Sequence, residues 1–136
     1  MKRMLGLSLL CLFLVGTFTA AEAQDVKLIL ATGGTAGTYY PFGGSMAKIW
    51  NSKIPGMNVT AQATGASAEN VRLINKKEAE LALVQSDTID FAYNAKEAFK
   101  EPLKAMSAVA VLYPEIIQVV VRGDGPVKTF ADLKGK

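Results

Sequence analysis

The chain has 136 residues, a formal net charge of +3, no histidine and one cysteine, Cys11. The charge is mild and no Lys/Arg cluster follows a helical stripe, so the composition argues against a nucleic-acid partner. Without histidine, the chain cannot form a Ser-His-Asp triad, a Cys-His pair or a zinc site of the usual ligands.

The first residues have the pattern of a secretory signal peptide. Lys2-Arg3 precedes the apolar stretch 5–18, which is shorter than the about 20 apolar residues that span a bilayer. A small-x-small motif then ends at Ala23. We expect cleavage after Ala23 and an extracytoplasmic, periplasmic location for residues 24–136, with a retained anchor helix as the alternative.

The exported part begins with a strand, a glycine-rich loop and a helix. "VKLILA" over 26–31 is rich in β-branched and leucine residues and ends at a glycine pair. Pro41 suits the first turn of a helix, because its missing N–H is not needed there. The helical spacing i, i+4, i+7, i+8 predicts a buried face formed by Phe42, Met46, Ile49 and Trp50.

The same order repeats twice. A strand is predicted within 57–67, followed by the helix "AENVRLINKKEA" with Ser67 as its N-cap. The third unit is a strand within 81–87 and a helix capped by Ser86 or Asp87. The buried face of that helix is predicted to be Ile89, Ala92, Tyr93 and Lys96. Three strand-to-helix units imply a parallel sheet with right-handed crossovers, and ligands bind beyond the carboxyl ends of such strands.

The last third of the chain is different. Residues 105–113 and 116–123 are near-continuous apolar runs, typical of strands covered on both faces. The following "TFADLKGK" has Thr129 and Asp132 at capping-box spacing and predicts the start of a helix. We expect a first lobe over 24–125, with 126–136 as the truncated start of a second lobe and the rest of that lobe missing.

The glycine-rich loops predict an anion site at one edge of the sheet. Glycine lets the backbone approach a ligand closely, and the helix that follows each loop offers N–H donors and a partial positive charge. Neither the P-loop pattern nor the G-x-G-x-x-G pattern is present, so nucleotide binding is disfavoured. The competing interpretation is that these Ser, Thr and Tyr residues only cap helices, bond within loops or pack.

Three stretches resemble the TAXI family, the extracytoplasmic solute receptors of TRAP (tripartite ATP-independent periplasmic) transporters. They are "LATGGTAGTYYPFGGSMAKIWN", "ATGASAENVRLINKKEAELALVQSD" and "VAVLYPEIIQVVVRGDGPVKTFADLKGK". The resemblance covers nearly all of residues 24–136. It implies an α/β fold of the periplasmic-binding-protein type II class: two lobes, each with a mainly parallel sheet flanked by helices, joined by crossing strands. Family members have a second lobe after the D-L-K-G-K motif.

The resemblance also implies a function. The protein would hold a small organic anion in the cleft, such as glutamate, glutamine or a dicarboxylate, and deliver it to TRAP membrane permease subunits. It would need no cofactor and perform no chemistry. By motif, the ligand-binding residues would be Gly34, Thr35, Gly37 and Tyr39 from the first loop, Thr64, Gly65 and Ser67 from the second, Gln85, Ser86 and Asp87 from the third, and Tyr113.

Two other functions stay open at this point. One is a secreted ligand-sensing domain without a transport role. The other is an enzyme that uses a carboxylate such as Asp87 or Asp90 in the same crevice. The chain has no histidine, and its glycine loops contain no carboxylate pair, which argues against an enzyme.

Overall fold

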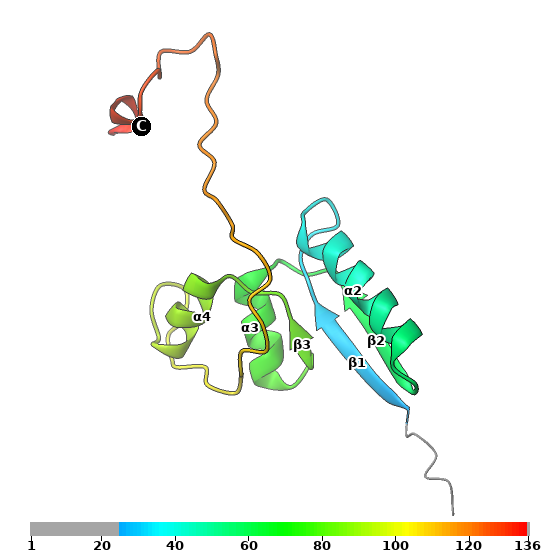
Figure 1. The fold of residues 1–136 in the computed structure, drawn as a ribbon. Helices are drawn as coiled ribbons and strands as arrows, with labels where there is room; N and C mark the ends of the chain where they lie inside the picture. Colours follow the sequence, from blue (N-terminus) through cyan, green and yellow to red (C-terminus); the bar gives the residue numbers. More distant parts are fainter. Residues whose placement is uncertain (1–24, 136) are drawn as a thin grey trace, which may run out of the picture. The chain divides into compact units, whose positions relative to one another are not determined.

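The computed structural model describes residues 25–135, so the predicted signal peptide lies outside the described residues. Contacts within the chain divide it after Met106 into two units. The first unit holds all the strands and α-helices that the structure describes (Figure 1). The predicted lobes, 24–125 and 126–136, stay a prediction.

The first unit is a three-stranded parallel sheet flanked by helices, which confirms the predicted α/β class. Its strands are β1 (Val26–Ala31), β2 (Met57–Gln62) and β3 (Leu81–Ala82), in the order β2-β1-β3. Both pairings are parallel, with Leu28 opposite Val59 and Leu30 opposite Leu81. Helices α2 (Tyr39–Lys53), α3 (Ser67–Lys76) and α4 (Ser86–Tyr93) follow the strands in turn.

Strand β1 has the predicted bounds, whereas β3 is much shorter than the predicted stretch 81–87. The chain beyond Ala82 still runs beside β1, because the Leu83 N–H donates to the Ala31 carbonyl at 3.0 Å. The Leu83 carbonyl, however, accepts a hydrogen bond from the side chain of Asn70 at 2.8 Å. The side-chain amide of Asn70 thus replaces the backbone hydrogen bonding by which β3 would continue.

Helix α2 packs against the sheet through a different face from the predicted one. Its buried residues are Gly43 and Ala47. Of the predicted face, Met46 and Trp50 pack partly against the core, but Phe42 is exposed and Ile49 is 58% exposed. The small residues decide the rotation of the helix, because they let its backbone approach Leu30, Val59 and Leu83 of the core cluster.

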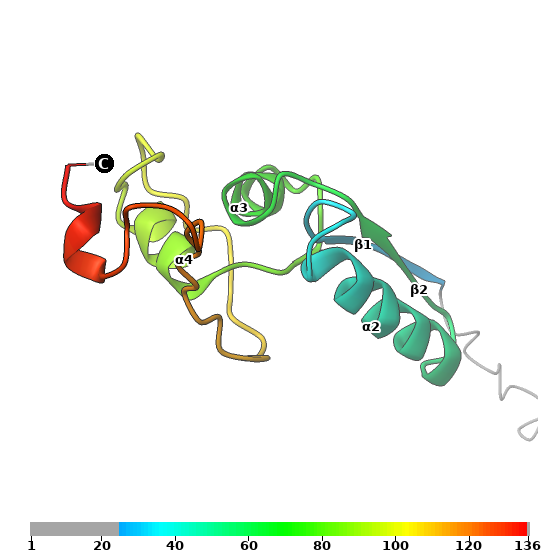
Figure 2. The ribbon, with the colours of Figure 1, turned by 90° about the horizontal axis from the view of Figure 1, so that it is seen from above.

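A second core cluster joins α3 to α4 and to the segment that follows α4. It consists of Val71, Ala92, Phe99 and Leu103, with Phe91 packed against it. The Leu103 N–H donates to the Ala92 carbonyl at 2.9 Å and fixes that segment. Figure 2 shows α2 and α3 on opposite sides of β1, so the sheet has a helix on each face.

The predicted face of α4 is wrong in part, and so are the predicted caps. Ala92 is fully buried, but Tyr93 is exposed and Lys96 lies beyond the end of the helix. Ser67 and Ser86 are the first helical residues rather than N-caps. The N-cap positions belong to Ala66 and Gln85, and neither makes a side-chain capping bond.

The second unit, from Ser107 on, does not contain the strands predicted over 105–113 and 116–123. Residues 106–122 form no regular structure, and Val111 and Ile117 are 97% and 91% exposed. A strand requires a neighbour for its backbone hydrogen bonds, and no described residue pairs with this segment.

The predicted capping box near the end of the second unit is present. The Thr129 N–H donates to Asp132 Oδ2 at 2.8 Å, although the element it caps is a single 3₁₀ turn, η1 (Phe130–Leu133). Within residues 25–135, no helix is both long and apolar enough to cross a membrane.

The close approach of α2 to β1 can be tested at two neighbouring glycines. A Cβ added to Gly43 would lie 2.6 Å from Thr32 Cγ2, whereas a Cβ on Gly44 would meet nothing within 4 Å. We expect G43A to lower the free energy of unfolding by about 1–3 kcal/mol through overpacking. G44A should raise it by about 0.5–1 kcal/mol, because alanine is the better helix former. Urea denaturation measures both, and equal effects would contradict the described packing.

Candidate functional site

Three loops meet at one edge of the sheet, as the sequence predicts. Because β1, β2 and β3 are parallel, their carboxyl ends lie on the same side, and the loops 32–38, 63–66 and 83–85 follow them. The Thr64 N–H donates to the Gly33 carbonyl at 3.3 Å, which joins the first two loops. The Gln85 N–H donates to Ser67 Oγ at 3.0 Å, which joins the third loop to the first residue of α3, directly after the second loop.

The side chain of Asn70 on α3 holds these strand ends together. It is fully buried. Its Nδ2 donates to the Thr32 carbonyl at 2.6 Å and to the Leu83 carbonyl at 2.8 Å, with a longer contact of 3.4 Å to Ala31. Its Oδ1 accepts from the Thr64 hydroxyl at 2.6 Å. One amide therefore bridges the ends of β1 and β3 and the loop after β2.

Thr32 completes this network between β1 and β2. It is fully buried, and both its N–H and its hydroxyl donate to the Gln62 carbonyl, at 3.0 and 2.6 Å. The backbone at the base of the first loop is therefore fixed before the loop reaches solvent. The residues beyond it are presented from a rigid base.

The first loop is the most open of the three. Gly34, Thr35 and Gly37 are exposed, and the Gly37 N–H closes a turn onto the Gly34 carbonyl at 2.9 Å. Tyr39, the first residue of α2, is half-buried and packs against the core. The first turn of α2 carries no acidic residue. No acidic side chain of that turn therefore offsets the partial positive charge at the N-terminus of α2.

The predicted residues of the second loop mostly bond within the protein. The Thr64 hydroxyl donates to Asn70 and accepts from the Ala66 N–H at 3.1 Å. The Gly65 N–H donates to Glu69 Oε2 at 2.7 Å. Ser67 is buried and accepts from Gln85. These contacts give the three residues a structural role in the loop, whatever they do with a ligand.

Backbone strain occurs at the junction of the second loop with α3. Ala66 has φ of 68° and ψ of −152°, a conformation that glycine adopts but that costs other residues about 1–3 kcal/mol. The hydrogen bonds of Thr64 and Gly65 hold the residue in this conformation. Strain of this kind clusters at ligand-binding loops.

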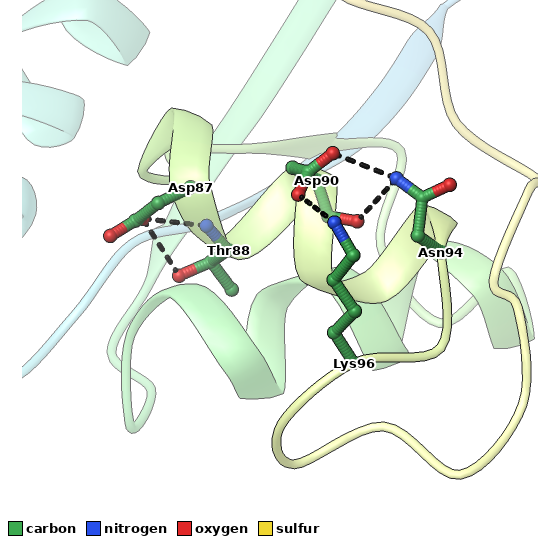
Figure 3. A network of polar contacts seen from close by, with 5 residues as sticks. All are labelled: Asp87, Thr88, Asp90, Asn94 and Lys96. Atoms are coloured by element: carbon green, nitrogen blue, oxygen red, sulfur yellow. Dashed lines mark hydrogen bonds and ion pairs between the residues drawn. The ribbon is translucent and has the colours of Figure 1, made fainter.

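In the third loop and α4, the carboxylates are engaged by their own neighbours. Gln85, Ser86 and Asp87 are exposed. The Thr88 N–H donates to Asp87 Oδ1 at 2.6 Å (Figure 3). Asp90 accepts from Asn94 at 2.7 Å and forms an ion pair with Lys96 at 3.0 Å, as Figure 3 also shows. Asp87 and Asp90 therefore do not form the pair that a general acid and a general base would form.

Tyr113 belongs to the second unit. Its hydroxyl donates to Glu115 Oε1 at 3.2 Å. Partial burial raises the pKa of this hydroxyl above its usual value, and the charge and hydrogen bond of Glu115 raise it further. Its proposed contribution to the ligand site stays a prediction.

A shallow, open groove lies between α2 and β2, lined by residues that include Lys48, Asn51 and Asn58. None of the predicted site residues lines this groove. No group of three or more acidic side chains within the described part of the chain is arranged to hold a metal ion.

A family model described as the NMT1-like family matches residues 30–136, which is most of the chain and includes all three loops. The chain belongs to the NMT1-like family. This family is of the periplasmic-binding-protein type and binds solutes. The fold of the first unit agrees with part of a lobe of such a protein.

Asn70 is the main residue of the site region that the sequence analysis missed. In this NMT1-like chain it stands in the "ATGASAEN" motif, beside the residues that were selected. An asparagine in a helix that follows a glycine loop does not by itself predict a buried polar contact. The prediction requires knowledge of which strand ends lie next to the helix. The carbonyls that it bridges come from positions 38 and 13 residues away in the sequence.

The bridging role of Asn70 predicts a large loss of stability on its removal. N70A leaves the buried carbonyls of Thr32 and Leu83 without a donor, so we expect the free energy of unfolding to fall by about 3 kcal/mol. A matched control is N58A on the exposed face of β2, with an expected change below about 0.5 kcal/mol. Denaturant unfolding of both variants measures this difference, and similar values for the two would refute the bridge.

N70D tests the chemistry of the same position, since it keeps the shape but replaces the donor with a carboxylate that faces carbonyl oxygens. Burial raises the folded-state pKa of such a carboxyl above the unfolded value of about 3.9. The penalty relative to the native chain is therefore smallest below that value and grows as the pH rises. A penalty that is independent of pH would contradict the described surroundings.

At Ala66, in contrast, we expect a substitution that removes the backbone strain to stabilise the protein. A66G removes the strain, and we expect a net gain of about 1 kcal/mol in the free energy of unfolding, after the entropy cost of glycine. The control A68G, two residues further on inside α3, should lose about 0.5–1 kcal/mol. Thermal or urea unfolding compares the two, and a loss in both variants would show that Ala66 is unstrained.

Proposed function

We propose that this NMT1-like chain is the extracytoplasmic solute-binding subunit of a TAXI-type TRAP transporter. Its ligand would be a small organic anion such as glutamate, glutamine or a dicarboxylate. The solute-binding character of the family supports the general function. The TAXI-like motifs of the three loops support the transporter class and the kind of solute.

The observation that carries the proposal is the meeting of three strand-to-helix loops at one sheet edge. A hydrogen bond of 3.3 Å joins the first loop to the second, and one of 3.0 Å joins the third loop to Ser67 at the start of α3, directly after the second loop. Ligands of open parallel sheets bind beyond the carboxyl ends of the strands. A solute at this edge can therefore contact all three loops at once.

The charges around this edge favour the first loop for the carboxylate of the solute. The first turns of α3 and α4 already contain Glu69 and Asp87, whereas that of α2 contains no acid. An exposed helix N-terminus stabilises an anion by about 0.3–1 kcal/mol, and by about 2 kcal/mol when partly buried. The carboxylate would lie near Gly34, Thr35 and the start of α2. An amide or amino group would point to Gln85 and Asp87.

An enzymatic role has little support. Asp90 lies in an exposed ion pair with Lys96, and Asp87 accepts from the Thr88 backbone. A general acid–base pair requires two titratable groups within reach of one reacting centre. No observation favours the sensing domain over the transport subunit. The two differ in their partner, because only the transport subunit docks on TRAP permease subunits.

The proposed location follows from the proposed role. A TRAP receptor works in the periplasm, and the predicted leader, cleaved after Ala23, would bring the chain there. Export also fits the absence of cysteine after Cys11, since no thiol would need protection in an oxidising compartment.

The proposal is tested by nuclear magnetic resonance with the ¹⁵N-labelled chain, because this measurement detects weak binding. Glutamate, glutamine and 2-oxoglutarate are titrated in turn, with putrescine as a cationic control. At least one acid should shift the amide signals of residues 33–39, 64–67 and 84–87. Signals that move only along the groove between α2 and β2, or none that move, would contradict the proposed site.

Two glycine variants sharpen this test. Gly34 and Gly44 both have open space where a Cβ would lie, so a side chain at either position should leave the fold intact. G34L fills the proposed site and should weaken binding at least tenfold, which is about 1.4 kcal/mol. G44L, on α2 away from the loops, should bind as the native chain does. Equal affinity in both variants would place the solute elsewhere.

A further inference from the structure

The side chain of Glu69 lies against the second loop, at the sheet edge where the solute is proposed to bind. Its Oε2 accepts the N–H of Gly65 at 2.7 Å, and both residues are exposed. The neighbouring N–H groups are also bonded, that of Thr64 to the Gly33 carbonyl and that of Ala66 to the Thr64 hydroxyl. All three N–H groups of this stretch are therefore occupied by acceptors of the protein itself.

The negative charge of Glu69 has no cationic partner within residues 25–135. The ion pairs of this part of the chain involve Asp90 and Asp124 instead. Arg72, the cationic residue nearest to Glu69 along α3, donates to the backbone carbonyls of two alanines. A second anionic group close to the second loop would therefore meet a carboxylate that no Lys or Arg neutralises, and like charges placed together are unfavourable.

The first loop has the opposite character. Gly34, Thr35 and Ala36 are exposed, and in the described part of the chain no protein acceptor binds their N–H groups. The first turn of α2, which follows, contains no acid. The two loops lie against each other, since a Cβ added to Gly33 would be 3.6 Å from the Cβ of Ala66. The edge thus presents open N–H donors on the first loop and a negative charge on the second.

We infer that Glu69 determines the charge selectivity of the site by disfavouring a second carboxylate on the solute. This inference rests on the function proposed above and narrows its solute class. One carboxylate of the solute binds the N–H groups of the first loop, and the other end of the solute faces the second loop. There Glu69 accepts a hydrogen bond from an amide or amino group but repels a carboxylate. The selected solutes are amino acids with a single carboxylate, such as glutamine, over glutamate and other dicarboxylates.

Glutamine and glutamate are matched probes, because they differ only in an amide and a carboxylate of the same shape. Their dissociation constants with the full chain are measured by titration of the ¹⁵N-labelled protein. We expect glutamine to bind about twofold to fivefold more tightly, the size of effect that exposed charges have on each other. A chain that binds both solutes equally, or prefers glutamate, would overturn this inference alone. A chain that binds neither would overturn the proposed function as well.

E69Q removes the charge but keeps the shape of the side chain and an oxygen that accepts from the Gly65 N–H. The two affinities should become nearly equal in this variant. In the native chain, the preference for glutamine should weaken as the salt concentration rises, because salt screens exposed charges. A purely structural role of Glu69 would produce neither response. An E69Q chain with the native ratio of affinities, or a native ratio that salt does not change, would overturn the role of Glu69.

Glu80 provides a matched control for the loss of one charge. Its Oε2 accepts the Ile29 N–H at 2.7 Å and the residue is exposed, like Glu69, but it lies directly before β3, whereas the loops follow the strands. E80Q should leave the ratio of the two affinities unchanged. E69K, which reverses the charge beside the second loop, should make the chain prefer glutamate. An equal response to E80Q and E69Q, or a preference for glutamine in E69K, would show that Glu69 does not set the selectivity.

Discussion

The amide of Asn70 is the contact on which the arrangement of the three loops depends. At the carboxyl ends of parallel strands, backbone carbonyls emerge from the sheet ladder and, when buried, require donors from elsewhere. In this chain the donor is one side-chain nitrogen that lies within 2.8 Å of the carbonyls of both Thr32 and Leu83. Its oxygen is bonded to Thr64. The stability of the sheet end and the position of the loops therefore have a common cause.

The residues of the loops fall into two groups, one that holds the loops together and one that is exposed to a ligand. Thr64, Gly65 and Ser67 form hydrogen bonds that hold the loops to one another. Gly34 and Thr35 are exposed on the fixed base that these bonds provide. We therefore regard the second loop mainly as a support and the first loop as the principal contact for a carboxylate. A receptor that uses backbone N–H groups in this way needs no arginine, because its donors are fixed in place before the ligand arrives.

The sequence predicts the order of the elements better than their contacts. The predicted bounds of β1 are correct because a β-branched run ends at glycines, and the repeated strand-to-helix order correctly predicts the parallel sheet. The predicted buried face of α2 is wrong because the size of the apolar side chains does not decide it; the small residues Gly43 and Ala47 allow the closest approach to the sheet. Ser67 looked like a cap because its type is common there, yet its hydroxyl bonds to Gln85, 18 residues away. The apolar runs after Met106 have strand composition, but a strand forms only with a neighbour, which composition does not reveal.

A crystal structure of the chain with glutamate bound would test the account most directly. The account predicts that the ligand carboxylate lies within hydrogen-bonding distance of backbone N–H groups of the first loop or the start of α2. Its amino group would point toward Gln85 and Asp87, with the Asn70 amide still bridging Thr32 and Leu83. Glutamate bound in the groove between α2 and β2, or loops held together without Asn70, would contradict it.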